Sequence, residues 1–329
     1  MGTVYHSYVV EQPAYCTDAK PRGGLKYAIS RECMTSQPLV LVYGATGTQG
    51  GPVAKRLLER GTPIRALART VARATDLAAA GAEVVQADLG DQEAVIAATS
   101  GVDSVFVQLS ASIPPAEMLQ HARHALTAVR DAGAPHLVIT TGSIIPTSRT
   151  GIASPDAKYA LLELINELTP HAVVLCPTLY LENFSVALRP AIEQGIIPYP
   201  IPVDVPVAYL SLDDHAAFAV AALDRPALAG QRFNLGGAEA LTGTQLAERF
   251  SRVLGASITY QAISSTSFGQ QLIPFLGEEV AQAIADMYAY EGGPGAAQLA
   301  PDLDATLAAL PIQQTPIDRW IAQAFDKYD

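Results

Sequence analysis

The feature that most restricts the fold is a glycine-rich segment between an apolar run and an amphipathic one. Residues 44–50 read Gly-Ala-Thr-Gly-Thr-Gln-Gly, directly after the apolar run 38–43 and directly before a helical pattern at 50–60. In a strand–turn–helix unit of this kind the first glycine permits a tight turn and the second lets a pyrophosphate approach the backbone. The third lets the helix pack closely on the strand. The segment therefore predicts the first unit of a parallel sheet that binds a dinucleotide.

Short apolar runs, typical of strands buried on both faces, alternate with longer amphipathic ones beyond this segment. We expect strands at 38–43, 63–68, 83–86, 103–108, 136–141 and 172–176, with helices near 50–60, 73–80, 91–99, 115–132 and 156–168. Gly61 and Gly81 stand where a helix needs a left-handed residue after its end, and Asp91 stands where an N-cap belongs. The pattern predicts an α/β fold with a doubly wound parallel sheet, the Rossmann arrangement.

The chain divides into three predicted parts. Residues 1–33 show neither helical nor strand periodicity, which predicts a disordered extension outside the fold. Residues 34–177 are predicted to form the dinucleotide-binding Rossmann domain. A proline-rich stretch at 196–207 then breaks the rhythm, and residues 178–329 are predicted to form mainly a smaller α/β lobe that shapes a substrate pocket. In that lobe Thr242 and Gln245 form a capping box for a helix that Gly255 ends.

Composition excludes several classes of protein. The 329 residues include 21 Lys and Arg against 32 Asp and Glu, and a net charge of −11 argues against binding to nucleic acid. The longest uncharged apolar stretches, such as 216–223, are too short to span a membrane. The three cysteines have no metal-ligand spacing and suit a reducing compartment. We expect a cytoplasmic monomer or homodimer that binds a small molecule and has no metal site.

The end of the second predicted strand favours one dinucleotide over the other. NAD-specific proteins place an acidic residue there for the ribose hydroxyls, whereas residues 65–70 read Arg-Ala-Leu-Ala-Arg-Thr. Arg69 is suited to forked hydrogen bonds with a 2′-phosphate, so the predicted cofactor is NADP(H). The other residues predicted to bind it are Gly44, Thr46, Gly47, Thr48, Gln49, Gly50, Asp88, Leu89, Gln108, Thr141 and Lys158.

Several segments together resemble one known family. They are GATGTQG at 44–50, IRALART at 64–70, Lys158, PTLYLEN at 177–183 and VAYLSLDD at 207–214. From about residue 38 onward the chain is similar to the NmrA-like branch of the atypical short-chain dehydrogenases/reductases. The resemblance implies NADP(H) binding and a helix N-cap at Asp214. That branch includes quinone and azo-compound reductases, relatives of isoflavone reductases, and regulators that bind the dinucleotide without performing chemistry.

The resemblance also shows where this chain departs from its relatives. Lys158 matches the family lysine, whose ammonium would bind the nicotinamide ribose and hold positive charge near the transferred hydride. Ser154 stands four residues earlier, where ordinary short-chain dehydrogenases have their tyrosine proton donor. Leu162 replaces the family glutamate, with Glu163 one position late, and Cys176 stands where an arginine is often found.

The missing tyrosine restricts the acceptor. Hydride addition to a simple ketone gives a strongly basic alkoxide that needs an acid, whereas addition to a quinone gives a phenolate-like anion of pKa about 10. The polar groups expected nearby are Lys158, Thr141, Ser143 and Tyr180, and the position of Ser143 suits a catalytic serine and a loop cap equally. We predict an NADPH-dependent oxidoreductase with catalytic Lys158, Ser143 and Tyr180. Its acceptor would be a quinone, an azo compound or an activated C=C or C=O bond.

Two other functions fit the same residues. A redox sensor would bind NADP(H) and control a protein partner without catalysis, and Ser154 in place of the tyrosine favours it. A more remote alternative is an epimerase or dehydratase that keeps its cofactor bound through the reaction cycle.

Overall fold

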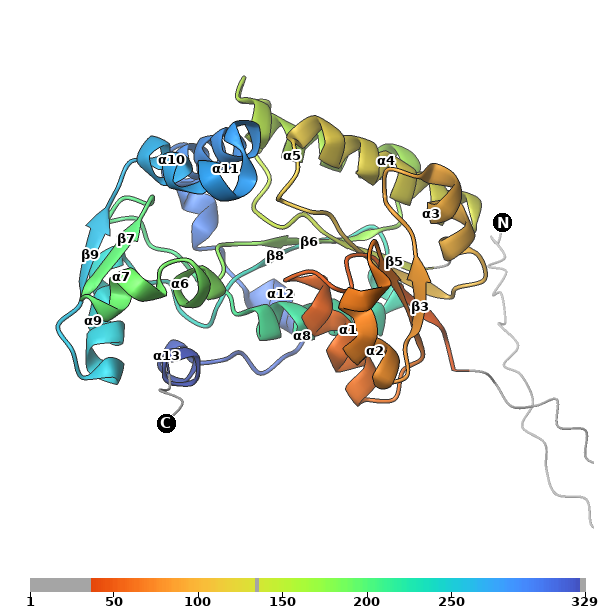
Figure 1. The fold of residues 1–329 in the computed structure, drawn as a ribbon, viewed down its shortest axis with the longest axis horizontal. Coiled ribbons are helices and arrows are strands. Elements are labelled where there is room, and N and C mark those ends of the chain that lie inside the picture. Colours follow the sequence, from red (N-terminus) through yellow and green to blue (C-terminus); the bar gives the residue numbers. More distant parts are fainter. Residues whose placement is uncertain (1–36, 134–135, 326–329) are drawn as a thin grey trace, which may run out of the picture. The chain divides into compact units, whose positions relative to one another are not determined.

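The computed structural model describes residues 37–133 and 136–325, and the predicted extension at 1–33 lies outside them (Figure 1). Its centre is a seven-stranded sheet of order β3-β2-β1-β4-β5-β6-β8, in which every neighbouring pair is parallel. The strands are β1 (Val40–Val42), β2 (Ile64–Ala68), β3 (Glu83–Gln86), β4 (Ser104–Gln108), β5 (His136–Thr140), β6 (Val173–Pro177) and β8 (Arg232–Leu235). The six predicted strands are all present, and the doubly wound sheet is confirmed.

The point where the strand order reverses lies between β1 and β4. Val40 and Val42 of β1 pair with Ile64 and Ala66 of β2 on one side and with Ser104 and Phe106 of β4 on the other. The chain leaves β1 toward one edge of the sheet and later returns to build the other edge from β4. Connections that run in opposite directions leave a crevice at the carboxyl ends of these strands, which is where ligands bind in open α/β sheets.

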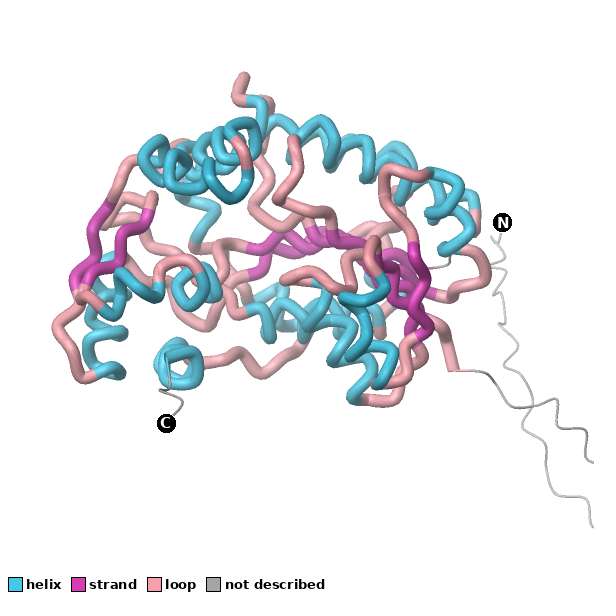
Figure 2. Tube along the Cα trace, in the orientation of Figure 1, coloured by secondary structure: helices cyan, strands magenta, loops and turns pink. Residues whose placement is uncertain are grey.

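Helices cover both faces of the sheet (Figures 1 and 2). One face packs against α3 (Gln92–Thr99), α4 (Pro115–Asp131) and α5 (Ala153–Leu168), and the other packs against α1 (Gly50–Glu59) and α8 (Leu212–Leu223). A short α2 (Thr75–Ala79) follows β2 after a 3-10 turn (Val71–Ala74). The Asp91 carboxylate accepts a hydrogen bond from the Ala94 amide at 3.1 Å, so the predicted N-cap of α3 is confirmed.

The seventh strand was not predicted. Strand β8 and helix α8 come from beyond residue 177, yet α8 packs on α1 and β8 extends the sheet beside β6. The sequence of β8 is Arg-Phe-Asn-Leu, in which only Phe233 and Leu235 are buried. An edge strand of this kind lacks the continuous apolar run of the central strands, because one side of its pleat faces solvent. The segment 178–329 therefore contributes to both the sheet and the smaller lobe.

The smaller lobe has a core of its own, rich in aromatic rings. A two-stranded parallel pair, β7 (Ile196–Tyr199) and β9 (Thr259–Ala262), lies among helices. Phe184 is fully buried between Tyr199, Tyr209 and Phe250, with ring centroids 5.0, 5.2 and 5.7 Å away. The helices are α6 (Glu182–Val186), α7 (Arg189–Glu193), α9 (Gly243–Leu254), α10 (Ser265–Leu276), α11 (Glu278–Glu291) and α13 (Ile317–Phe325).

Local signals in this lobe are correct. The Thr242 hydroxyl and the Gln245 side chain form the predicted capping box, and Gly255 ends α9 with φ +65°. Two short elements, a 3-10 turn (Ala296–Leu299) and α12 (Asp304–Ala309), lead from α11 back beneath the sheet toward α13.

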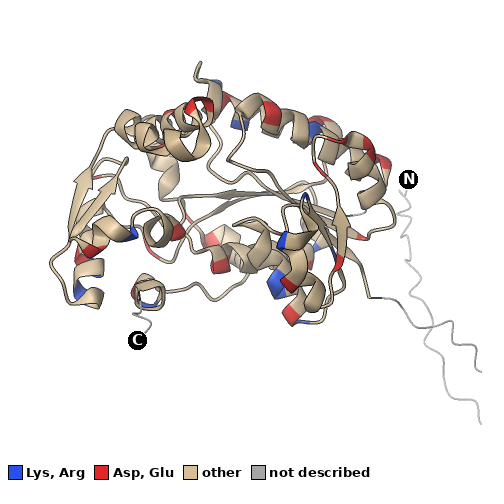
Figure 3. Ribbon diagram, viewed as in Figure 1, with Lys and Arg blue, Asp and Glu red and all other residues tan. Residues whose placement is uncertain are grey.

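Most charged residues of the described chain lie on the helices (Figure 3). Within the described residues, no helix combines the length and the apolar character needed to cross a membrane.

Candidate functional site

The glycine-rich turn between β1 and α1 is tight, as predicted. Gly44 has φ +70°, and a Cβ atom there would lie 2.5 Å from Oε1 of Gln108. A Cβ atom on Gly50 would lie 2.3 Å from the Gly44 carbonyl oxygen. The absence of a side chain at these two positions is what lets the loop turn and lets α1 start directly against the strand.

The groups around this turn fit the phosphates of a dinucleotide. In the described chain no side chain caps the N-terminus of α1, and its first turn contains no acidic residue. Uncapped amides at a helix N-terminus favour an anion. Arg69 lies just beyond β2, is exposed and forms no ion pair with a described residue, whereas Arg65 is held by Glu83 at 3.0 Å. Arg69 therefore remains available for a 2′-phosphate.

Three other predicted cofactor residues also lie at the carboxyl edge of the sheet. Gln108, at the end of β4, lies against the glycine turn and donates a hydrogen bond to the Leu109 carbonyl. Asp88 follows β3 and accepts a hydrogen bond from the Gly90 amide at 2.8 Å. Leu89 packs against the core beneath α4, and its carbonyl oxygen is 2.8 Å from Nδ1 of His124.

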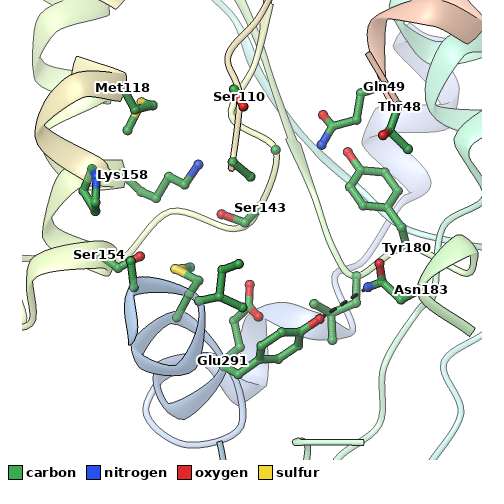
Figure 4. Close-up of a pocket in the computed structure, with 18 of the residues that line it drawn as sticks. Thr48, Gln49, Ser110, Met118, Ser143, Ser154, Lys158, Tyr180, Asn183 and Glu291 are labelled. Atoms are coloured by element: carbon green, nitrogen blue, oxygen red, sulfur yellow. Dashed lines mark hydrogen bonds between the residues drawn. The ribbon is translucent and has the colours of Figure 1, made fainter. Parts of the chain in front are cut away.

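A cavity of about 330 Å³ opens beside the turn (Figure 4). The strands β1, β4, β5 and β6 all send residues into it from their carboxyl ends, and α5 and α11 close it from the side. Its apolar wall consists of Ile113, Met118, Leu179, Ile284 and Met287. Its polar residues are Thr48, Gln49, Ser110, Ser143, Ser154, Lys158, Thr178, Tyr180, Glu182, Asn183, Tyr288 and Glu291.

Lys158 is the cationic residue of this cavity. It projects from α5, and its Nζ donates a hydrogen bond to the Thr141 carbonyl oxygen at 2.7 Å. Burial lowers the pKa of Lys158 to about 8, against the attraction of Glu291. The Thr141 hydroxyl does not reach the cavity, because it is buried and donates to the Ser143 carbonyl at 2.5 Å. Thr141 therefore contacts Lys158 through its backbone carbonyl, and its hydroxyl does not lie where the predicted side-chain donor is needed.

Ser143 and Tyr180 both line the cavity with Lys158. The Ser143 Oγ lies 3.4 Å from the Ile144 carbonyl oxygen, so its hydrogen bond within the protein is weak. The Tyr180 hydroxyl is buried without a hydrogen-bond partner in the described chain and points toward Gln49 (Figure 4). Oε1 of Gln49 is also buried without a partner. These unpaired groups mark a part of the cavity suited to a polar ligand.

Comparison with known families decides the relationship. The sequence model of the NmrA-like family matches residues 36–321 of this chain. The chain belongs to the NmrA-like family. The predicted membership is therefore confirmed over the sheet and the smaller lobe together.

Known relatives of this NmrA-like chain include reductases. It is 29% identical over 259 residues to the NAD(P)H azoreductase of Xenophilus azovorans, covering 76% of this chain and 86% of that one. It is 29% identical over 236 residues to quinone oxidoreductase 2 of Escherichia coli strain K12, covering 71% and 81%. An NADPH-dependent quinone oxidoreductase of Escherichia coli, solved with NADPH, superposes with a TM-score of 0.74 at 25% identity, covering 88% of this chain and all of that one.

The departures from the family can now be placed. Ser154 lines the cavity where ordinary short-chain dehydrogenases have their tyrosine. Leu162 packs partly buried against the core, while Glu163 is half exposed and paired with Arg149 at 2.5 Å. Glu163 therefore lies outside the cavity and does not replace the family glutamate. Cys176 is buried, which raises the pKa of its thiol to about 11 and makes it the inert residue expected.

One predicted cap is wrong. Ser211, not Asp214, is the N-cap of α8, and its hydroxyl accepts a hydrogen bond from the Asp214 amide at 3.0 Å. The Asp214 carboxylate is instead buried and accepts hydrogen bonds from the amide and the hydroxyl of Thr315 at 2.9 and 2.8 Å. It therefore joins the sheet layer to the segment that leads into α13.

Two further polar groups belong to the cavity wall, and sequence reasoning missed the second. Asn183 donates hydrogen bonds to the hydroxyls of Tyr199 and Tyr288 at 3.0 and 3.3 Å. Glu291, at the end of α11, is 2% exposed and lines the cavity with Lys158. A glutamate at the end of a helix gives no local sign of burial, so only the packing of α11 against α5 could reveal it.

Proposed function

We propose that this protein is an NADPH-dependent reductase that transfers a hydride to a small, flat, electron-poor acceptor such as a quinone, an azo compound or an activated double bond. The observation that carries the proposal is the position of the half-buried Lys158 in a cavity that begins at the glycine turn. The reductase relatives support it, and so does the fit of the turn to a dinucleotide phosphate.

The cofactor has its own set of residues in this proposal. Bound NADPH supplies the hydride. The glycine turn and the N-terminus of α1 hold the phosphates shared by both dinucleotides, while Arg69 binds the 2′-phosphate that distinguishes NADPH from NADH. Gln49 and Lys158 both lie within 4.0 Å of the position that a Cβ atom of Gly142 would take, so they meet at the inner end of the turn. This proximity supports a cofactor site that opens into the cavity beside Lys158.

The acceptor lies against the apolar wall. Met118, Ile284 and Met287 offer contacts to a planar ring and exclude water from it. With a pKa of about 8, Lys158 is mainly charged at neutral pH and stabilises the anion that hydride transfer creates on the acceptor. Ser143 and Tyr180 offer hydroxyls that orient the polar atoms of the acceptor. An anion of low basicity suits this set, because it needs less help from an acid than a ketone alkoxide does.

The test is an NADPH oxidation assay on the purified chain with a benzoquinone, an azo dye and an enone. Lys158→Ala should lower turnover by about 10²–10³ while NADPH still binds, since it removes one group that stabilises the anion. The control is Lys55→Ala, because Lys55 is exposed on α1 and, among the described residues, pairs only with the exposed Glu59. Tight NADPH binding without turnover on any acceptor would replace the reductase with the regulatory alternative, and a Lys158→Ala variant of full activity would remove the role of the lysine.

A further inference from the structure

The cavity contains an acidic group that the proposed chemistry has not used. Glu291 is the last residue of α11, and its side chain rises into the cavity below Ser143 and across from Lys158 (Figure 4). Although it is 2% exposed, no hydrogen bond joins its carboxyl group to another residue in the described part of the chain. A carboxyl group that lines a cavity together with an ammonium group, and that has no protein hydrogen bond, is placed to contact a ligand.

The surroundings of Glu291 define its charge. The titratable groups that face it are Lys158 from α5, Tyr288 from α11 itself and Tyr199 from β7. The two tyrosine hydroxyls lie 2.9 Å apart and both accept hydrogen bonds from Asn183, and among the described residues neither forms a hydrogen bond with the carboxyl group. Burial raises the pKa of Glu291 to about 8, while Lys158 lowers it. At neutral pH the cavity therefore holds a protonated acid beside a charged ammonium.

We infer that Glu291 is the proton donor of this reductase and serves in place of the tyrosine that is absent at Ser154. The inference rests on the proposed function. A hydride with its electron pair adds to the acceptor, which becomes an anion. The O–H bond of the Glu291 carboxyl group then breaks, and an O–H bond forms on a quinone anion or an N–H bond on an azo anion. The resulting carboxylate takes a proton from solvent, so each turnover consumes one hydride and one proton.

The acid strength of Glu291 suits these anions. The conjugate acid of a phenolate-like product has a pKa of about 10, and Glu291 has a pKa of about 8. The equilibrium constant for proton transfer from Glu291 to the product anion is therefore roughly a hundred. Lys158 alone would have to supply both the positive charge and the proton, and it would lose the charge when it lost the proton. With two groups, the ammonium keeps its charge while the carboxyl group delivers the proton.

The test compares Glu291→Gln with Glu279→Gln, an exposed glutamate on the same helix. Glutamine keeps the shape of the side chain but donates no acidic proton. We expect kcat to fall by about 10²–10⁴ in Glu291→Gln, with NADPH affinity unchanged and no change in Glu279→Gln. The wild-type kcat should be constant below about pH 8 and decline above it, where Glu291 and Lys158 both lose their protons, so the rate of Glu291→Gln is compared with that of the wild type below pH 8. Glu291→Asp keeps the acid and should recover part of the rate.

A second measurement is independent of turnover. The infrared spectrum of the wild type near neutral pH should contain a protonated carboxyl band that disappears above about pH 8 and is missing from Glu291→Gln but not from Glu279→Gln. Wild-type turnover combined with an unaltered kcat in Glu291→Gln would overturn the proton-donor role and leave the reductase intact. Absence of the band from the wild type would overturn it regardless of activity. A wild type without turnover would overturn the reductase and the donor role together.

Discussion

Gly50 and Gly51 are neighbours in the first turn of α1, and the structure assigns opposite outcomes to the same substitution at these two positions. A Cβ atom at Gly50 would lie 2.3 Å from the carbonyl oxygen and 2.7 Å from the carbonyl carbon of Gly44. Both atoms belong to the backbone of the glycine turn, so no side chain can move aside. At Gly51 the nearest atom is the Ala45 carbonyl oxygen at 3.5 Å, an ordinary van der Waals contact.

The expected change in the free energy of unfolding is the difference between two opposing effects. Alanine is favoured over glycine inside a helix by up to about 1 kcal/mol, whereas overpacking against rigid neighbours costs about 1–3 kcal/mol. Because the contact at Gly50 is with the backbone, the upper end of the cost applies. We expect Gly50→Ala to lower the free energy of unfolding by about 2 kcal/mol, and Gly51→Ala to raise it by up to about 1 kcal/mol.

Urea unfolding followed by circular dichroism measures both changes, and a fluorescence titration with NADPH follows the site. Gly50→Ala must displace the Gly44 carbonyl, so it should weaken NADPH binding as well as stability, whereas Gly51→Ala should leave binding unchanged. Equal unfolding free energies for Gly50→Ala and the wild type would refute this account of the turn. So would a loss of stability in Gly51→Ala as large as that in Gly50→Ala.

Two further predictions concern charge. Arg69→Ala removes the exposed guanidinium after β2, so the Kd for NADPH should rise by about ten- to a hundredfold while the Kd for NADH stays nearly constant. Equal losses of affinity for both dinucleotides would contradict the assignment of Arg69 to the 2′-phosphate. His215 is fully buried, and burial lowers its pKa from 6.5 to about 4. Between these values the unfolded chain binds a proton that the folded chain does not, so stability should fall by up to about 3 kcal/mol as the pH falls through this range. His215→Gln does not titrate and should show a smaller fall in urea unfolding at low pH; parallel wild-type and variant curves would disprove the role of His215.

Local signals in the chain were sufficient for most of the fold. The central strands are continuous apolar runs because both of their faces are covered, and they were predicted within a residue or two of their ends. Asp91, Thr242 and Gly255 mark helix ends through contacts within a few residues of themselves. Strand β8 was missed because its edge position leaves only alternate residues buried.

In the candidate site, too, some features could be predicted from local sequence and others were decided by packing. The glycine turn and Arg69 could be located from spacing alone, because a turn and the residue after a strand are set by neighbours in the chain. Thr141 was assigned to its hydroxyl, yet packing directs that hydroxyl to the Ser143 and Leu175 carbonyls and leaves the backbone oxygen to bind Lys158. A side chain's direction in a crowded core depends on its neighbours in space, which the sequence around it does not specify.

The sequence by itself determined the parallel sheet, its glycine turn, the basic residue Arg69 after β2 and the position of Lys158 on the helix after β5. Only the tertiary structure decided that Glu291 lies in the same cavity as Lys158. The two residues are far apart in the chain and come together because α11 packs on α5. Burial in that contact, rather than the residue type, raises the pKa of Glu291 and gives it a proton to donate.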